Sequence, residues 1–341
     1  MQLGSSFICD RRVTVFGFIP TPWVCGGIMT PVTPERTKLR CTDCGHEKAF
    51  PVPLTQMKRL CRGLGFAVAI ASVTLAFVPV AYSAPPQQPL ASCHQFIPYG
   101  MPLTIKGVPL SADSTHAFVC RRAYLVYNDE AAKLPEWVAY TLTPAHAIGC
   151  ATRSNAFAAD NTLPEDSRAK PADYVGSGYD MGHIAPDGDM RWNLDVERES
   201  FQLSNMTPQL PGLNRGLWKL LETAVRAGAY ENGHTLLIYA GPIYNVATDK
   251  KIGSDQVDVP TGFYKIVVDM TTNQYVAFLF PQADDLGNDL NSVYTTLESV
   301  EFKTGIIFPI PFSAAESKIW TFDFKKLTVD MKDKCHGSSV E

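Results

Sequence analysis

The chain has 341 residues, of which 45% are hydrophobic and 19% are charged, a composition that excludes a disordered or collagen-like chain. The formal net charge is −4, and residues 84–341 carry 21 Lys and Arg against 30 Asp and Glu. This balance excludes a globally basic nucleic-acid coat, so a polyanion would have to meet a local basic groove or a metal ion.

Residues 1–56 form an N-terminal extension that the sequence leaves unassigned. They are rich in Pro, Gly, Arg and Thr and lack convincing helical or strand periodicity. Because the segment that follows is typical of a signal peptide, one interpretation is a misassigned start codon. The alternative is a metal knuckle, since Cys41, Cys44 and His46 have the first half of a zinc-ribbon spacing, but no second close cysteine pair follows.

Residues 57–83 have the three parts of a secretory signal peptide. A basic cluster at residues 57–62 precedes an apolar run over residues 64–80, and small residues stand at 81 and 83, the positions that a signal peptidase requires. The alternative is a single membrane anchor, because the apolar run is at the short limit of a spanning helix. We expect cleavage after Ser83, a secreted or periplasmic protein, and no stable membrane partner after cleavage.

The exported part begins with an arm over residues 84–110, which is rich in Pro and Gly and is expected to be irregular. A single domain over residues 111–341 follows. Four cysteines lie after the cleavage site, which indicates two disulfides, and the sequence leaves all three pairings open. These four are Cys93, Cys120, Cys150 and Cys335.

The domain is predicted to have an α+β fold, an antiparallel sheet core flanked by helices. Apolar or alternating stretches predict strands at residues 123–127, 137–142, 235–239, 263–268 and 275–280. Apolar residues at three-and-four spacing predict a helix over residues 217–225, ending near Gly228 or Gly233. Because the strands mostly lack alternating crossover helices, an α+β fold is favoured over a doubly wound one.

Polar side chains able to take part in catalysis are concentrated between residues 179 and 222. Gly182 directly before His183 lets the backbone bend closely and present the imidazole, and Asp180 is placed to fix its tautomer or bind a cation. The whole set comprises Asp180, His183, Asp187, Asp189, Asn205, Gln209, Asn214 and Glu222.

Asn214 and Glu222 are eight residues apart. On a regular helix this spacing leaves them roughly 80° apart around the axis and about 12 Å apart along it, so both cannot easily ligate one ion. We therefore expect Asn214 to bind a hard cation directly and Glu222 to hold one of its waters, as in a magnesium site with few protein ligands. The alternative for Asn214 is a helix N-cap.

The stretch from Ser177 to Glu222 resembles the ββα-metal DNA/RNA non-specific endonucleases, relatives of secreted bacterial nucleases and mitochondrial endonuclease G. The family signature is Asp-Arg-Gly-His, and weaker agreement spans most of residues 120–308. The ordered matches are Asp180-Met-Gly-His183, Ala185-Pro186, Asp189-Met190, Ser200-Phe201, Leu203-Ser-Asn205-Met206, Pro208-Gln209 and Asn214-Arg-Gly-Leu-Trp-Lys-Leu-Leu-Glu222.

The resemblance implies a ββα-metal catalytic motif and a role for each matching residue. His183 would be the general base, and Asn214 the sole direct protein ligand of Mg²⁺, with Mn²⁺ as the alternative metal. Glu222 and Asp180 would hold metal-bound waters, and Asn205 and Gln209 would support the site. The substrates implied are DNA and RNA, and a homodimer and an inhibitor protein are compatible partners.

One position departs from the family pattern: Met181 stands where the signature has arginine. A methionine cannot contact a substrate phosphate as a guanidinium does, and losing such a donor costs on the order of a hundredfold in rate. Arg153, Arg191 and Arg215 are candidates for compensation, and Arg153 is favoured because it lies in the family's Arg-Phe-Asp neighbourhood. The alternatives to a nuclease are a binding module that lost its chemistry and a phosphodiesterase for small substrates.

Asp187 and Asp189 are interpreted as supporting or turn residues and are left out of the candidate site.

Overall fold

The computed structural model describes residues 29–31, 38–41, 47–49, 90–244, 250–311, 314–316 and 335. The chain divides into two units, Met1–Ala81 and Tyr82–Glu341. The expected signal peptide and its cleavage site lie outside the described residues. Within those residues, no helix has the length and apolar character that crossing a membrane requires.

The first unit contains a three-stranded antiparallel sheet in the order β1-β2-β3. The sequence analysis left this extension unassigned and predicted none of these strands. Each strand has only three or four residues, too few for an alternating pattern to stand out in the sequence. Cys41 ends β2, whereas Cys44 and His46 of the zinc-knuckle alternative lie outside the described residues. The strands are β1 (Met29–Pro31), β2 (Lys38–Cys41) and β3 (Glu47–Ala49).

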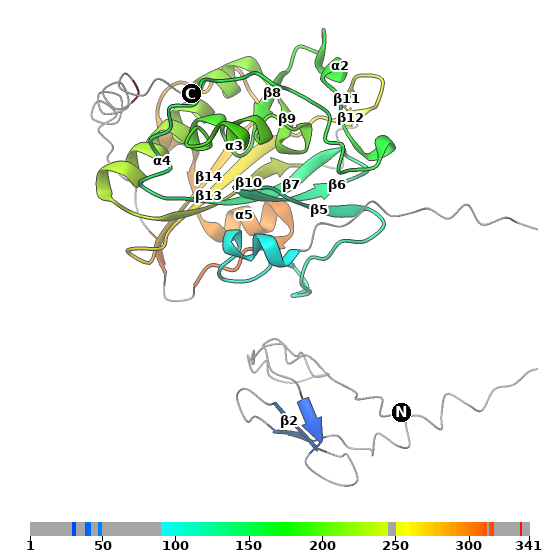
Figure 1. The fold of residues 1–341 in the computed structure, drawn as a ribbon, viewed down its shortest axis with the longest axis vertical. Coiled ribbons are helices and arrows are strands. Elements are labelled where there is room, and N and C mark those ends of the chain that lie inside the picture. Colours follow the sequence, from blue (N-terminus) through cyan, green and yellow to red (C-terminus); the bar gives the residue numbers. More distant parts are fainter. Residues whose placement is uncertain are drawn as a thin grey trace, which may run out of the picture. The chain divides into compact units, whose positions relative to one another are not determined.

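The second unit is built on an eight-stranded sheet in the order β15-β14-β13-β10-β7-β6-β5, with β17 paired to β14 (Figure 1). All of its pairings are antiparallel except that of β17 with β14. All five predicted strands are present, and the α+β prediction is confirmed. The strands are β5 (His116–Cys120), β6 (Tyr124–Asp129), β7 (Leu134–Leu142), β10 (Leu236–Ile243), β13 (Gly262–Asp269), β14 (Gln274–Pro281), β15 (Tyr294–Thr295) and β17 (Ala315–Glu316).

Three two-stranded sheets accompany the main sheet. They pair β4 (Leu103–Thr104) with β16 (Ile306–Ile307), β11 (Lys251–Ile252) with β12 (Val257–Asp258), and β8 (Asp180–His183) with β9 (Met206–Gln209). The α-helices are α2 (Pro171–Tyr174), α3 (Leu194–Glu199), α4 (Lys219–Asn232) and α5 (Leu297–Thr304), and η5 (Leu213–Trp218) is a π-helix. The short 3-10 helices are η1 (Leu90–Phe96), η2 (Glu165–Ser167), η3 (Asp187–Asp189), η4 (Leu203–Asn205) and η6 (Leu290–Val293).

The main sheet separates two hydrophobic clusters because successive side chains of a strand point to opposite faces. Val126, Val138 and Ile238 pack on one face together with Leu221 and Val225 of α4. On the other face, buried aromatic and aliphatic side chains pack with η1 and α5. Figure 1 shows α3, α4, β8 and β9 on the first side and α5 on the second. The β8–β9 hairpin and the start of α4 therefore share one face of the sheet.

Helix α4 ends at the later of the two predicted positions. Gly233 is its C-cap with φ 70°, a left-handed conformation that glycine adopts without steric cost, whereas Gly228 is buried inside the helix. The helix begins at Lys219, and the π-helix η5 precedes it without a break. The apolar face that the sequence spacing predicts is the face that lies on the sheet.

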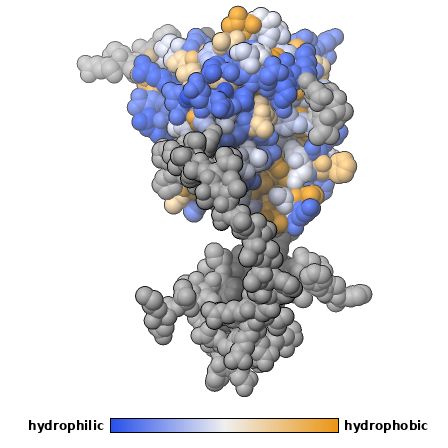
Figure 2. Space-filling view, turned by 90° about the vertical axis from the view of Figure 1, so that its right-hand side faces the viewer, coloured by the Kyte–Doolittle hydropathy of each residue, from blue (hydrophilic) through white to orange (hydrophobic). Residues whose placement is uncertain are grey.

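The surface of the second unit is mostly hydrophilic on the face drawn in Figure 2, with scattered hydrophobic side chains. Four large hydrophobic side chains in the described part of the chain are more than half exposed, and all lie outside the main sheet. They are Ile105, Val108, Val175 and Phe302.

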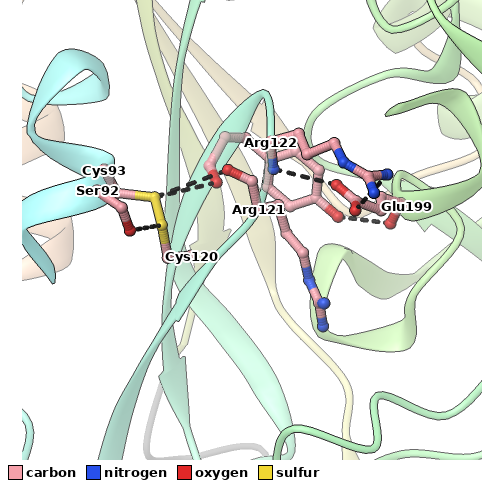
Figure 3. The surroundings of a disulfide bond; sticks show 7 residues. Ser92, Cys93, Cys120, Arg121, Arg122 and Glu199 are labelled. Carbon is pink, nitrogen blue, oxygen red and sulfur yellow. Dashed lines mark hydrogen bonds and ion pairs between the residues drawn. A yellow bond between two sulfur atoms is a disulfide. The ribbon is translucent and has the colours of Figure 1, made fainter. Parts of the chain in front are cut away.

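Two disulfides link distant parts of the second unit, Cys93 to Cys120 and Cys150 to Cys335. Figure 3 shows the first of them between η1 and the end of the edge strand β5. The arm expected to be irregular is thus partly ordered as a 3-10 helix, and Cys93 and Phe96 are buried against the sheet. The sequence did not predict this helix because its order comes from packing and the cross-link rather than from local periodicity.

Candidate active site

A pocket of about 810 Å³ lies where β8, η3, η5 and α4 meet. Six of the eight residues proposed for the site line it: Arg153, Asp180, His183, Asn214, Arg215 and Glu222. Met181, which stands at the departure from the family signature, lines it as well. The two other proposed residues, Asn205 and Gln209, are fully buried and do not line the pocket.

His183 ends strand β8 and is 7% exposed. Its ring meets the ring of Phe201 edge-on at 4.7 Å, and its Nε2 is buried without a hydrogen-bond partner in the described structure. Burial lowers the pKa of His183 to about 3, and Arg153 and Arg191 act in the same direction against the opposing charge of Asp187. The imidazole is therefore neutral at physiological pH and able to accept a proton.

Asn205 fixes the backbone that follows His183. Its Oδ1 accepts a hydrogen bond from the Ala185 N–H at 2.9 Å, and its Nδ2 donates to the Ala185 and Ser200 carbonyls, both at 2.8 Å. Gln209 lies opposite Asp180 in the β8–β9 register and packs against Gly182. A Cβ atom at position 182 would lie 2.2 Å from the Gln209 Oε1, so only glycine leaves room for this side chain. Both residues thus contact the backbone next to His183.

Asp180, Asn214 and Arg215 form one hydrogen-bonded group at the pocket. Asn214 donates from Nδ2 to the Asp180 Oδ2 at 2.8 Å, and Arg215 binds both carboxylate oxygens, at 2.8 and 2.6 Å. Although partial burial acts in the opposite direction, the bonds from Arg215 and Asn214 lower the pKa of Asp180. The carboxylate is ionised. Asn214 donates its hydrogen bond to this carboxylate through Nδ2, so its side-chain carbonyl oxygen is left for a cation.

Asn214 and Glu222 do not lie on one regular helix, so the expected separation of roughly 80° and about 12 Å does not apply. Asn214 is in the π-helix, and Gly216 has the non-helical dihedral angles φ −101° and ψ −114°, which kink the chain before α4. Both side chains line the same pocket. The kink could not be predicted from the sequence because the apolar spacing continues through it.

Glu222 lies one turn into α4, and its Oε1 is buried without a hydrogen-bond partner in the described structure. Burial raises the pKa of Glu222 to about 7, and the charge of Lys265 is the strongest influence in the opposite direction. A buried carboxylate oxygen without a donor is available to a metal-bound water.

The arginines of the pocket are held by aspartates. Arg153, favoured to compensate for Met181, pairs with Asp187 and lies 4.9 Å from the centroid of the Phe201 ring. Arg191 also binds Asp187, at 2.6 and 2.9 Å. Arg215 is the most accessible of the three, with 70% of its side chain exposed. Asp187 thus orients two of the cations that line the pocket.

Arg226 is a pocket residue that the sequence analysis missed. Its Nε donates to the Asp189 Oδ1 at 2.7 Å, and the other oxygen of Asp189 accepts the Tyr140 hydroxyl at 2.9 Å. Arg226 is four residues after Glu222 and thus on the same helix face, which is the signal that could have identified it. Asp189, left out of the candidate site, is the residue that fixes it.

The pocket residues fit a hard divalent cation. They offer the Asn214 carbonyl and the Asp180 and Glu222 carboxylates, which are the oxygen ligands that Mg²⁺ and its waters prefer. The orphaned Glu222 Oε1 and His183 Nε2 are the buried polar atoms that a hydrated ion and a water nucleophile would satisfy.

A separate group of metal-ligand types lies outside the pocket, on β5, β6 and β7. Ligand atoms of His116, Asp129 and Glu136 lie within 4.8 Å of one another. A hydrogen bond to Glu136 raises the pKa of His116 to about 9, so its imidazolium neutralises one of the carboxylates without a metal. We assign no function to this group.

Several known proteins are similar to this chain. The family model for DNA/RNA non-specific endonucleases matches residues 100–312. A nuclease of Nostoc sp. is 31% identical over 264 residues, covering 73% of this chain and 93% of the relative. Mitochondrial endonuclease G of Bos taurus is 30% identical over 204 residues, covering 55% and 67%, and a nuclease of Serratia marcescens is 30% identical over 204 residues, covering 57% and 75%.

Among solved structures, the crystal structure of the EndoG/EndoGI complex has a chain that matches with a TM-score of 0.55 and 28% identity, over 63% of this chain and 90% of that chain. The family match spans more than half of the sequence and contains all eight of the proposed site residues. This chain therefore belongs to the DNA/RNA non-specific endonucleases, a family of metal-dependent phosphodiester hydrolases.

Proposed function

We propose that the protein is exported and hydrolyses DNA and RNA without sequence preference, with Mg²⁺ as cofactor and His183 as general base. The observation that carries this proposal is a buried, neutral imidazole in the same pocket as Asn214 and the orphaned Glu222 carboxylate. The residues supply a base, a cation site and positive charge, which are the three components that phosphodiester hydrolysis by water requires.

Each residue has a defined part in the proposed reaction. His183 accepts the proton of the attacking water, and Asn205 holds the backbone that follows it. Asn214 would bind the cation through its carbonyl oxygen, and Asp180 and Glu222 would orient its waters. When bound, the cation offsets the charge that develops on the phosphate and on the leaving 3′ oxygen. Mn²⁺, which also accepts oxygen ligands, is the alternative metal.

The cations at the pocket explain how an acidic protein meets a polyanion. Side chains that bind phosphates position a strand without carrying sequence information, which is consistent with cleavage at many sequences. The positively charged side chains that line the pocket are Arg153, Arg191, Arg215, Lys219 and Arg226.

Export is supported by the signal-peptide pattern of residues 57–83 and by two disulfides, which form in oxidising compartments. We propose cleavage after Ser83 and a secreted or periplasmic location. We also propose an inhibitor protein as a partner, because the matched EndoG structure is a complex of that protein with EndoGI. A homodimer stays a proposal that sedimentation of the purified protein would test.

The test is cleavage by the full chain, expressed in a bacterium that exports it and purified with its disulfides formed. We expect degradation of plasmid DNA and of structured RNA in Mg²⁺, complete loss on chelation, and loss of at least a thousandfold in His183→Ala. N-terminal sequencing checks the cleavage site.

Four results would contradict the proposal. Undiminished cleavage by His183→Ala would exclude His183 as the general base. Cleavage that continues after chelation would exclude a metal requirement. A folded wild type that binds nucleic acid without cleaving it would instead support the binding module. Hydrolysis confined to small phosphodiesters would support the third alternative.

A further inference from the structure

Lys265 is a buried charge whose role the proposed reaction does not explain. It lies in the middle of β13, between Ala240 of β10 and Phe278 of β14, and is 0% exposed. Its Nζ has no hydrogen-bond partner within the described residues. An ammonium without a partner is costly in a protein interior, so a compensating charge is required.

The Lys265 side chain lies on the sheet face that carries α4. It alternates with Phe263 and Val267, both members of the hydrophobic cluster beneath that helix. Its Nζ lies 4.4 Å from the centroid of the Trp218 ring, at the N-terminal end of α4. Glu222 follows Trp218 by four residues and so occupies the same helix face.

Burial lowers the pKa of Lys265, and the two carboxylates that oppose this effect are those of Glu222 and Asp189, with Glu222 the stronger. Both oxygens of Asp189 already accept hydrogen bonds, one from Arg226 and one from Tyr140. Glu222 has a buried oxygen that accepts none in the described structure. Of the two, Glu222 is therefore the carboxylate free to serve as the counter-charge of Lys265.

We propose that Lys265 is a positioning residue, whose buried side chain beneath α4 is the counter-charge that holds the Glu222 carboxylate at the pocket. This inference rests on the proposed role of Glu222 as a holder of metal-bound water. The other charged groups around Glu222 already have partners, since Asp189 pairs with Arg226, and Asp187 pairs with Arg153 and Arg191. The effect of Lys265 on Glu222 lowers a pKa that burial raises, in agreement with this arrangement.

The test compares Lys265→Met with Lys265→Arg in the full-length protein. Methionine keeps the length of the side chain without its charge, and we expect cleavage at pH 7 to fall on the order of tenfold or more. The acidic limb of the pH–rate profile should move up by about one pH unit, since removing a cation raises the pKa of a nearby carboxyl. Mg²⁺ binding to the protein without substrate, measured by isothermal titration calorimetry, should weaken, and arginine should restore most of the activity.

A Glu222→Gln background separates positioning from a structural effect. If Lys265 acts through Glu222, Lys265→Met should add little further loss there. An equal loss in both backgrounds, or a wild-type pH profile and Mg²⁺ affinity in Lys265→Met, would overturn the inference. Full activity in Glu222→Gln alone would instead refute the proposed role of Glu222, and the role of Lys265 with it. Thermal unfolding of each variant checks that it is folded.

Discussion

Met181 has an apolar environment on one side and the charged pocket on the other. It packs against a hydrophobic cluster together with Phe157 and Tyr179, and its neighbour Asp180 is already paired with Arg215. Arg153 is expected to compensate for the arginine that the family signature has at position 181, and its guanidinium pairs with Asp187. The pocket thus contains cations, but none projects from position 181 itself.

We therefore expect Met181→Arg to raise kcat/KM on DNA by about ten- to a hundredfold, because an added guanidinium in the pocket can stabilise charge on the phosphate. Met181→Leu, which adds no charge, should leave the rate nearly unchanged. Initial rates on plasmid DNA measure both. An unaltered rate in Met181→Arg would indicate that Arg215 or Arg153 already supplies this charge.

His183 also makes stability depend on pH. Its pKa in the folded protein, about 3, is below the ordinary value of 6.5, so the unfolded chain binds a proton first as the pH falls. The contribution of the neutral imidazole to stability is fully present above pH 6.5 and is lost between pH 6.5 and pH 3. Over that range the free energy of unfolding falls by up to about 1.4 kcal/mol per pH unit.

Urea denaturation of the wild type and of His183→Gln at several pH values tests this expectation. The wild type should lose more unfolding free energy than the variant between pH 6.5 and 4, since glutamine takes up no proton. Equal losses in the two proteins would show that other groups cause the acid sensitivity.

At the residue scale, the sequence could identify His183, Asn214 and Glu222 because their order and spacing match a family signature. It could not identify Lys265 or the pairing of Arg226 with Asp189, since these depend on contacts between segments 37 or more residues apart. Neither local periodicity nor a short motif contains such information.

The β8–β9 hairpin is the element that places His183. Gly182 faces Thr207 in its register, and the Gln209 side chain occupies the space that a Cβ at position 182 would need. The Trp218 Nε1 donates to the His183 carbonyl at 3.1 Å and so joins the hairpin to the start of α4. The position of the imidazole therefore depends on close packing on two sides.

Gly182→Ala should lower the unfolding free energy by about 1–3 kcal/mol through overpacking, and reduce cleavage by displacing His183. The second change Gln209→Ala removes the obstructing side chain, so the double variant should be less destabilised than the sum of the two single changes. Chemical denaturation and cleavage rates measure both effects. Additive losses would contradict the proposed contact.

At the element scale, the five predicted strands were found because each is a long apolar or alternating run. The edge strands β5, β15 and β17 and the 3-10 helix η1 were not predicted, since they are short and owe their order to pairing or a disulfide. The π-helix η5 was not predicted for another reason. Its apolar residues keep the helical spacing, and only the backbone at Gly216 departs from helical geometry.

The charge of the whole molecule opposes its substrate, whereas the charge of the pocket attracts it. Residues 84–341 carry a net charge of −9, yet five Lys and Arg side chains line the pocket. Because salt screens both effects, the affinity for DNA should depend on the short-range contacts in the pocket and weaken as salt rises.

Lys219 is an exposed lysine at the pocket and tests this view. Lys219→Gln should raise KM for DNA a few-fold, reduce the slope of log KM against log salt by about one, and leave kcat nearly unchanged. The matched control is Lys303→Gln in α5, on the other side of the sheet, which should change neither quantity. Equal effects of the two variants would mean that general surface charge governs binding.

The Cys150–Cys335 disulfide has a consequence for the order of events during synthesis. The two cysteines are 185 residues apart, and Cys335 follows every strand of the main sheet in the chain. Strands can pair as they emerge, but this cross-link can close only after the entire sheet has been made, and only where thiols are oxidised. The covalently closed protein thus exists only after the whole chain has reached an oxidising compartment, and a chain with reduced thiols lacks this restraint.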